Sequence, residues 1–172
     1  MKLKLSDYSS IADVVAAIAI VLSLVYVGIQ IADNTRATRS ANANAASSQV
    51  SSAYAAVGSS PETSDVFYRA MTDPMSVTPA ERAQSVYLMQ SFMLAFQNSY
   101  YLSNEGTLDA QMRESITENL KAVKDQPGFI MFWSQRKPVF TRDFQAFMED
   151  VIFAYDGEHT ASGIYEPSDE NQ

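Results

Sequence analysis

Residues 11–31 read IADVVAAIAIVLSLVYVGIQI, and this stretch sets the architecture of the chain. It contains one charged residue, Asp13, and no proline. An α-helix rises about 1.5 Å per residue, so a helix of this length covers the roughly 30 Å hydrocarbon core of a bilayer. The stretch therefore predicts a single transmembrane helix near the N-terminus.

A cleaved secretory signal is the alternative interpretation of the same stretch. Lys2 and Lys4 suit the basic start of a signal, and the small residues at 41–45 resemble a cleavage site. However, the apolar run exceeds the about 7–15 residues usual for a signal. The small residues also lie far beyond its end, where cleavage would be badly placed. Both points favour a retained anchor over a removed signal.

The basic residues around the span predict its orientation. Arg36 and Arg39 follow the span more closely than Lys2 and Lys4 precede it. Because basic residues near a span favour its cytoplasmic side, we expect a cytoplasmic C-terminal domain. The expected location is the bacterial inner (cytoplasmic) membrane, with membrane lipid as one partner.

Composition excludes several classes of function. The chain has 172 residues, a net charge of −8 and no cysteine. An acidic surface repels phosphate backbones, so we expect no nucleic-acid partner. Without cysteine there are no disulfides, thiol nucleophiles or thiolate metal sites.

The remainder of the chain predicts an all-α fold. Residues 32–57 hold neither proline nor glycine, so the membrane helix is expected to continue as a stalk. Ser60-Pro61 and the capping box Thr78–Glu81 predict helix starts, and Gly106 predicts a C-cap. No run alternates with period two, which excludes strands. The predicted divisions are an N-terminal segment 1–10, a transmembrane helix 11–31, a stalk 32–58, a helical bundle 59–153 and an acidic tail 154–172.

Apolar spacing predicts how the bundle packs. The helix expected at 79–104 is apolar on two faces, which is typical of a central helix. A second amphipathic helix runs through Leu108 to Val123, and a short aromatic helix surrounds Trp133. A last helix, capped by Thr141, is expected to bury a stripe made of Phe140, Phe144, Phe147, Met148, Val151 and Ile152.

Three segments together resemble a widespread family of small bacterial membrane-anchored proteins. They are YVGIQIADNTRATR (26–39), FQNSYYLSNEGTLD (96–109) and PGFIMFWSQRKPVFTRDFQAFMEDVI (127–152). The resemblance covers roughly residues 8–153. It implies an N-terminal span with arginines on its cytoplasmic side, and it implies no established activity.

Small and polar residues recur along one side of the anchor. The seam residues, alternating four and three apart, are Ala12, Ala16, Ala19, Ser23, Tyr26 and Gln30. Small residues let helices approach closely in lipid, and Ser or Gln can hydrogen-bond across the contact. The seam predicts self-association or docking on a membrane partner, although abundant Ala and Ser can also produce such a register by chance. On the stalk, an apolar seam is expected to pack on the bundle: Ala43, Ala46, Val50, Ala53 and Val57.

The sequence offers little catalytic chemistry. His159 is the only histidine and lies in the polar tail, so it cannot build a metal site or serve a serine nucleophile in the bundle. Glu114 and Glu118 share a helix face but lack the histidines of a di-iron bundle, which favours a solvated acidic face. We therefore expect no catalytic residue, metal or cofactor.

One polar and aromatic cluster on the central helix is a candidate ligand pocket. It comprises Asn98, Tyr100, Tyr101 and Glu105. Such residues more often satisfy backbone groups of a nearby loop. Likewise, Trp133 beside Phe129 and Phe132 suggests either an aromatic cage or, more simply, a core residue.

Two functions follow from these observations. The first is a non-enzymatic, single-pass membrane protein that assembles as a homo-oligomer or as an accessory subunit of a larger membrane complex. The alternative is a membrane-tethered helical domain that senses a ligand or acts as an enzyme.

Overall fold

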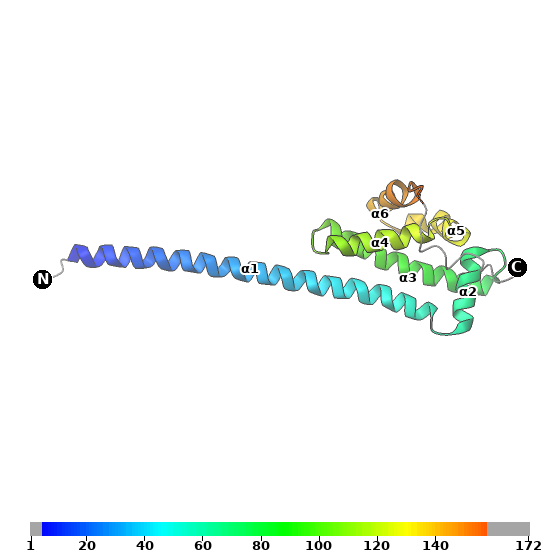
Figure 1. The fold of residues 1–172 in the computed structure, drawn as a ribbon, viewed down its shortest axis with the longest axis horizontal. Helices are drawn as coiled ribbons and strands as arrows, with labels where there is room; N and C mark the ends of the chain where they lie inside the picture. The colour runs from blue at the N-terminus through cyan, green and yellow to red at the C-terminus, as the bar shows by residue number, and fades with distance from the viewer. Residues whose placement is uncertain (1–4, 158–172) are drawn as a thin grey trace. The chain divides into compact units, whose positions relative to one another are not determined.

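The computed structural model describes residues 5–157, and all regular structure within that range is helical (Figure 1). This confirms the prediction of an all-α fold. The helices are α1 (Leu5–Val57), α2 (Pro61–Thr72), α3 (Pro79–Asn104), α4 (Ala110–Val123), α5 (Pro127–Arg136), η1 (Lys137–Val139), α6 (Arg142–Phe147) and η2 (Met148–Phe153). Of the predicted terminal segments, residues 1–4 and 158–172, with His159, lie outside the described residues.

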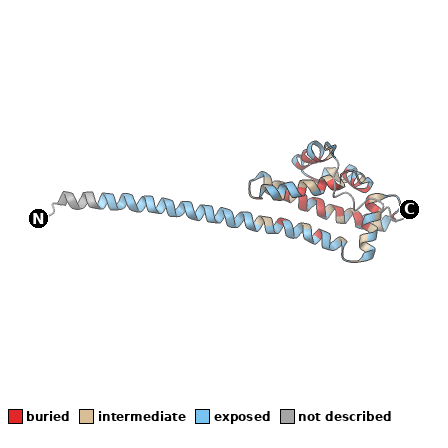
Figure 2. Ribbon diagram, viewed as in Figure 1, coloured by how far each residue is buried: buried red, intermediate tan, exposed pale blue. Residues whose placement is uncertain are grey.

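The chain divides into two compact units, residues 1–40 and 41–172. In the first unit, every side chain described from Ala12 to Ser40 is exposed, as the pale blue ribbon of Figure 2 shows. α1 is the one helix among the described residues that is long and apolar enough to cross a membrane. Its most apolar 18-residue window has a mean hydropathy of 2.6, and none of it is buried. The long apolar N-terminal helix is thus confirmed.

The second unit is a helical bundle built around α3. This helix contacts α2, α4 and α5, and it buries residues on two faces, including Met89, Phe92 and Met93. That arrangement confirms the central position predicted for it. The 41–57 part of α1 also belongs to this unit and packs on the core through Ala46 and Ala53, which are 2% and 3% exposed. The apolar stalk seam is therefore confirmed.

Local capping explains where the bundle helices begin and end. The Ser60 side chain accepts a hydrogen bond from the Thr63 backbone N–H at the start of α2. Thr78 and Glu81 form a complete capping box at the start of α3. Gly106 follows α3 with φ of +68°, a left-handed conformation that glycine adopts without a steric penalty. The predicted starts at Ser60 and Thr78 are confirmed, whereas the C-cap of α3 is Glu105 and Gly106 is the residue that follows it.

The C-terminal region differs from the single helix that the sequence predicts. Phe140 is buried but precedes α6, and the last turns form the π-helix η2. A π-helix has more residues per turn than an α-helix, so side-chain directions shift along it. As a result Ile152 is fully buried, whereas Val151 is 43% exposed and leaves the predicted core stripe. Thr141 holds the N-cap position of α6, as predicted, but its side chain makes no capping hydrogen bond. Its backbone N–H and its hydroxyl both donate to Oε1 of Gln97.

An ion-pair network joins α2 to α3. Arg69 donates to Asp65 within α2 at 2.9 Å and to Oε1 of Glu81 on α3 at 2.8 Å. The other carboxylate oxygen of Glu81 accepts the Thr78 backbone N–H at 2.7 Å. These hydrogen bonds, that from Arg69 first, lower the pKa of Glu81 to about 2.

Candidate functional site

The predicted association seam lies on the exposed surface of α1. Each of its six residues is exposed, and Tyr26 retains 62% of its accessible surface. The Ser23 hydroxyl donates to the Ala19 carbonyl one turn earlier at 2.8 Å. That hydroxyl can therefore only accept a hydrogen bond from a partner helix unless it first breaks this internal bond.

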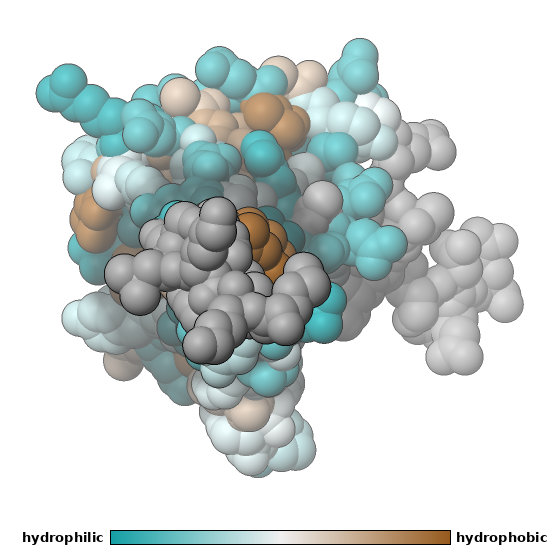
Figure 3. Space-filling model, turned by 90° about the vertical axis from the view of Figure 1, so that its left-hand side faces the viewer, coloured by the Kyte–Doolittle hydropathy of each residue, from teal (hydrophilic) through white to brown (hydrophobic). Residues whose placement is uncertain are grey.

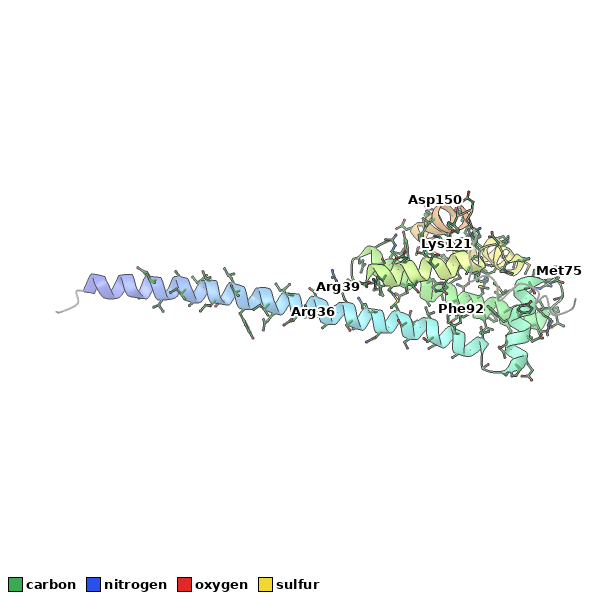
Figure 4. The ribbon with its side chains drawn as sticks, viewed as in Figure 1. Arg36, Arg39, Met75, Phe92, Lys121 and Asp150 are labelled. Carbon is green, nitrogen blue, oxygen red and sulfur yellow. The ribbon has the colours of Figure 1, made fainter. Side chains whose placement is uncertain are left out.

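Two arginines follow the apolar stretch on α1. Figure 4 labels Arg36 and Arg39 on this part of the helix, and both are exposed. Within residues 5–157, neither arginine forms an ion pair with a carboxylate. Both guanidinium groups can therefore meet anionic groups that lie outside this part of the chain.

The structure distributes the predicted polar cluster over different surroundings. Asn98 lines an open groove with Ser48, Ser52 and Leu94, and its amide donates to Gln49 on α1 at 3.2 Å. Neither Tyr101 nor Glu105 lines that groove. A single pocket that unites Asn98, Tyr101 and Glu105 stays a prediction.

The aromatic members of this region serve the core. Tyr100 packs on Phe144 and Phe147, with ring centroids 5.7 and 4.9 Å apart. Tyr101 stands edge-on to Tyr100 at 5.8 Å. Trp133 is 6% exposed and stacks on Phe140 at 5.5 Å, which confirms the interpretation of this tryptophan as a core residue.

The acidic residues considered as ligands are dispersed. Glu114 is exposed, and Glu118 pairs with Lys121 at 3.0 Å. Among the residues described, no group of three or more His, Asp and Glu side chains is arranged to hold a metal ion. Glu149 pairs with Lys137, and Asp150 is exposed.

A groove that the sequence did not predict runs between α1 and α4. It has a volume of about 230 Å³. Its floor is Phe96 and Ser99 of α3, which are 5% and 0% exposed. The walls are formed by Ala46, Ser47, Val50, Ser51 and Tyr54 of α1, and by Met112, Ser115, Ile116 and Asn119 of α4.

A smaller cavity of about 60 Å³ adjoins the groove, since Tyr54, Phe96 and Asn119 line both. The Tyr54 hydroxyl donates to the Asn119 side-chain oxygen at 3.4 Å, which is long for a hydrogen bond. The Tyr54 ring packs edge-on against Phe92 with centroids 4.8 Å apart. Although Tyr54 is 53% exposed, the partial burial of its side chain raises the pKa of the hydroxyl above the usual value.

The periodicity of α1 alone predicts this groove only weakly. Ser47, Ser51 and Tyr54 flank the apolar stalk seam, but only the placement of α4 shows that they face another helix across a gap. No family model, curated protein or solved structure matches the chain.

Proposed function

We propose that the chain is a non-enzymatic, single-pass membrane protein that assembles in the membrane, as a homo-oligomer or as an accessory subunit of a larger complex. The observation that carries the proposal is the uncovered apolar surface of α1. Twelve large side chains between Val14 and Ile31 are 47–67% exposed, and nothing within the described chain covers them.

The magnitude of this exposure favours lipid as the covering medium. Burying one Val, Leu or Ile side chain contributes about 1.5–3 kcal/mol. Leaving twelve large apolar side chains in water would cost more than the about 5–15 kcal/mol by which a whole domain is stable. Monomeric soluble proteins rarely expose a continuous apolar surface of this extent.

Assembly is proposed from the position of the seam on that same helix. Small seam residues such as Ala16, Ala19 and Ser23 permit close backbone approach along one side of a lipid-facing helix. Of the twelve large side chains, only Tyr26 belongs to the seam, and the others occupy the other sides. The alternative of a membrane-tethered sensing domain draws on the groove between α1 and α4.

Membrane extraction tests the anchoring. We expect the full chain to stay with the membrane after alkaline carbonate treatment and to dissolve only in detergent. Intact mass should show the uncleaved N-terminus. Release by carbonate, or a mature chain that begins after residue 45, would contradict the anchor and support the signal-peptide interpretation.

Single-cysteine labelling tests the orientation. Because the chain has no cysteine of its own, an introduced cysteine is the only thiol that can react. Met75 is 74% exposed in the loop between α2 and α3 (Figure 4), so Met75→Cys offers an accessible thiol. For a cytoplasmic domain, a membrane-impermeant maleimide should label this thiol only after cell lysis. Labelling in intact spheroplasts would reverse the proposed orientation.

Assembly is tested by substitutions in the seam. Ala16→Leu and Ser23→Leu should raise the monomer fraction in proteoliposomes, measured by energy transfer between labelled copies diluted with lipid. Ala17→Leu makes the same change on a neighbouring side of the exposed helix and should leave the transfer efficiency unchanged. Strictly monomeric wild-type protein, together with no response to either seam substitution, would refute self-association.

A further inference from the structure

We propose that the groove between α1 and α4 is a binding site for a small, uncharged, single-chain amphiphile. The observation is a pair of adjoining spaces with different chemistry. The outer groove of about 230 Å³ is flanked by hydroxyl groups, and the inner cavity of about 60 Å³ is lined almost entirely by apolar side chains.

The inner cavity suits the alkyl end of such a ligand. Its walls include Phe92, Met93 and Phe129, and its polar residues are Tyr54 and Asn119, where it adjoins the groove. This space is partly open to solvent. A water molecule in it would find polar side chains only at Tyr54 and Asn119, whereas an alkyl chain needs no polar partner.

The outer groove suits a polar, neutral head. Ser47, Ser51 and Ser115 lie on its walls and are exposed. Ser99 on its floor and Asn119 on its wall already donate to backbone carbonyls, Ser99 to Ala95 and Asn119 to Ser115. The three wall serines are thus the hydroxyls best placed to bond a ligand in place of water.

Charge excludes the ionised relatives of this ligand. No lysine, arginine, histidine, aspartate or glutamate of the described chain lines either space. Residues 41–157 carry 8 basic and 13 acidic side chains, a net charge of −5, so the surrounding surface repels a carboxylate head. A glycerol or alcohol head needs neither a counter-ion nor desolvation of a charge.

The contact between Tyr54 and Asn119 lies where the two spaces adjoin. At 3.4 Å the bond is weak, and the Asn119 side chain is exposed. An alkyl chain that runs from the groove into the inner cavity passes this one weak hydrogen bond, and the Tyr54 ring packs beside it on Phe92.

Cysteine protection in proteoliposomes tests the site with the full chain. In Ser51→Cys, the ligand should shield the thiol from N-ethylmaleimide. In the matched variant Ser48→Cys, the thiol lines a different groove and should react at an unchanged rate. The probe is 1-monocaprin, a neutral decanoyl glycerol, and the charged comparison is decanoate. At a probe concentration roughly nine times Kd, modification of the thiol in Ser51→Cys should slow about tenfold, because the free fraction is 1/(1 + [L]/Kd).

Filling the groove provides the second measurement. Ser115→Phe, added to Ser51→Cys, places a ring in the groove and should abolish protection by monocaprin. Glu114→Phe is one residue earlier, also exposed and outside the groove lining, and should preserve it. Circular dichroism establishes that each variant folds. If Ser115→Phe does not fold, the comparison of Ser51→Cys with Ser48→Cys decides alone.

Three outcomes would overturn the site as proposed: equal slowing in Ser51→Cys and Ser48→Cys, no slowing in either, or decanoate protecting as well as monocaprin. Supply of the ligand by the bilayer rests on the proposed membrane anchoring. The two failures are distinguishable, because loss of anchoring appears in carbonate extraction and loss of the site appears only in the protection of the thiol in Ser51→Cys.

Discussion

Gly128→Ala is the substitution whose effect the packing of the bundle defines best. Gly128 lies in the first turn of α5, against the end of α2. A Cβ at this position would lie 2.1 Å from the Ala70 carbonyl oxygen and 2.7 Å from Cα of Met71. Both atoms belong to the backbone of α2, so no side-chain rotation can relieve the clash, and α5 must move away from α2.

The expected cost is about 2–3 kcal/mol, toward the upper end of the usual range for overpacking. Replacing glycine inside a helix contributes up to about 1 kcal/mol in the opposite direction, which the steric term exceeds. For a bundle of this size, that loss lowers Tm by roughly 5–12 °C.

Denaturant unfolding in detergent, followed by tryptophan emission, measures the effect. Trp133 is the only tryptophan, and it is buried in the core of the same bundle. Gly58→Ala is the matched control, because a Cβ there would meet only the Tyr54 carbonyl at 3.5 Å, an ordinary contact. If Gly128→Ala is as stable as wild type, or no less stable than Gly58→Ala, then the backbones of α5 and α2 do not pack as closely at Gly128 as described.

Three other predictions concern the bundle. Because the pKa of Glu81 is lowered to about 2 from 4.5, its contribution to stability is present above pH 4.5 and lost as pH falls toward 2. Glu81→Gln should therefore flatten that part of the curve of stability against pH. An unchanged curve would contradict the stabilisation of the Glu81 carboxylate by Arg69. Ile152→Ala should destabilise the bundle by about 2–5 kcal/mol. Val151→Ala, at an exposed position, should change the free energy of unfolding by no more than about 0.5 kcal/mol. Equal losses for the two variants in urea titrations would argue for a regular α-helix in place of η2. Thr78→Ala removes the capping hydrogen bond of α3 and should cost about 1 kcal/mol, while Thr78→Ser should retain most of it in the same titration.

The two units differ in how their exposed apolar side chains are distributed. The face drawn in Figure 3 mixes hydrophilic and hydrophobic residues. Exposed apolar side chains in the bundle, such as Tyr87, Leu94 and Val139, are separated along the sequence by polar residues. From Val14 to Ile31 they are almost continuous. The nearly continuous apolar surface thus belongs to the first unit.

Features that depend on local chemistry could be predicted from the order of the residues alone. The apolar length of residues 11–31, the caps at Ser60 and Thr78, and the left-handed Gly106 follow from hydropathy and backbone preference within a few residues. Helical periodicity likewise predicted that Ala46 and Ala53 would be buried, since an apolar stripe needs a partner surface.

Features that depend on residues far apart in the chain emerge only from the packing of the helices. The exposure of Val151 follows from the π-helical turn, and Thr141 donates to Gln97 on α3. The close approach at Gly128 depends on α2, and the groove exists because small residues of α1 face α4 across the floor formed by α3. Local preference specifies how each helix begins and which side is apolar, but a gap between helices arises only when their surfaces are brought together and do not fill the space.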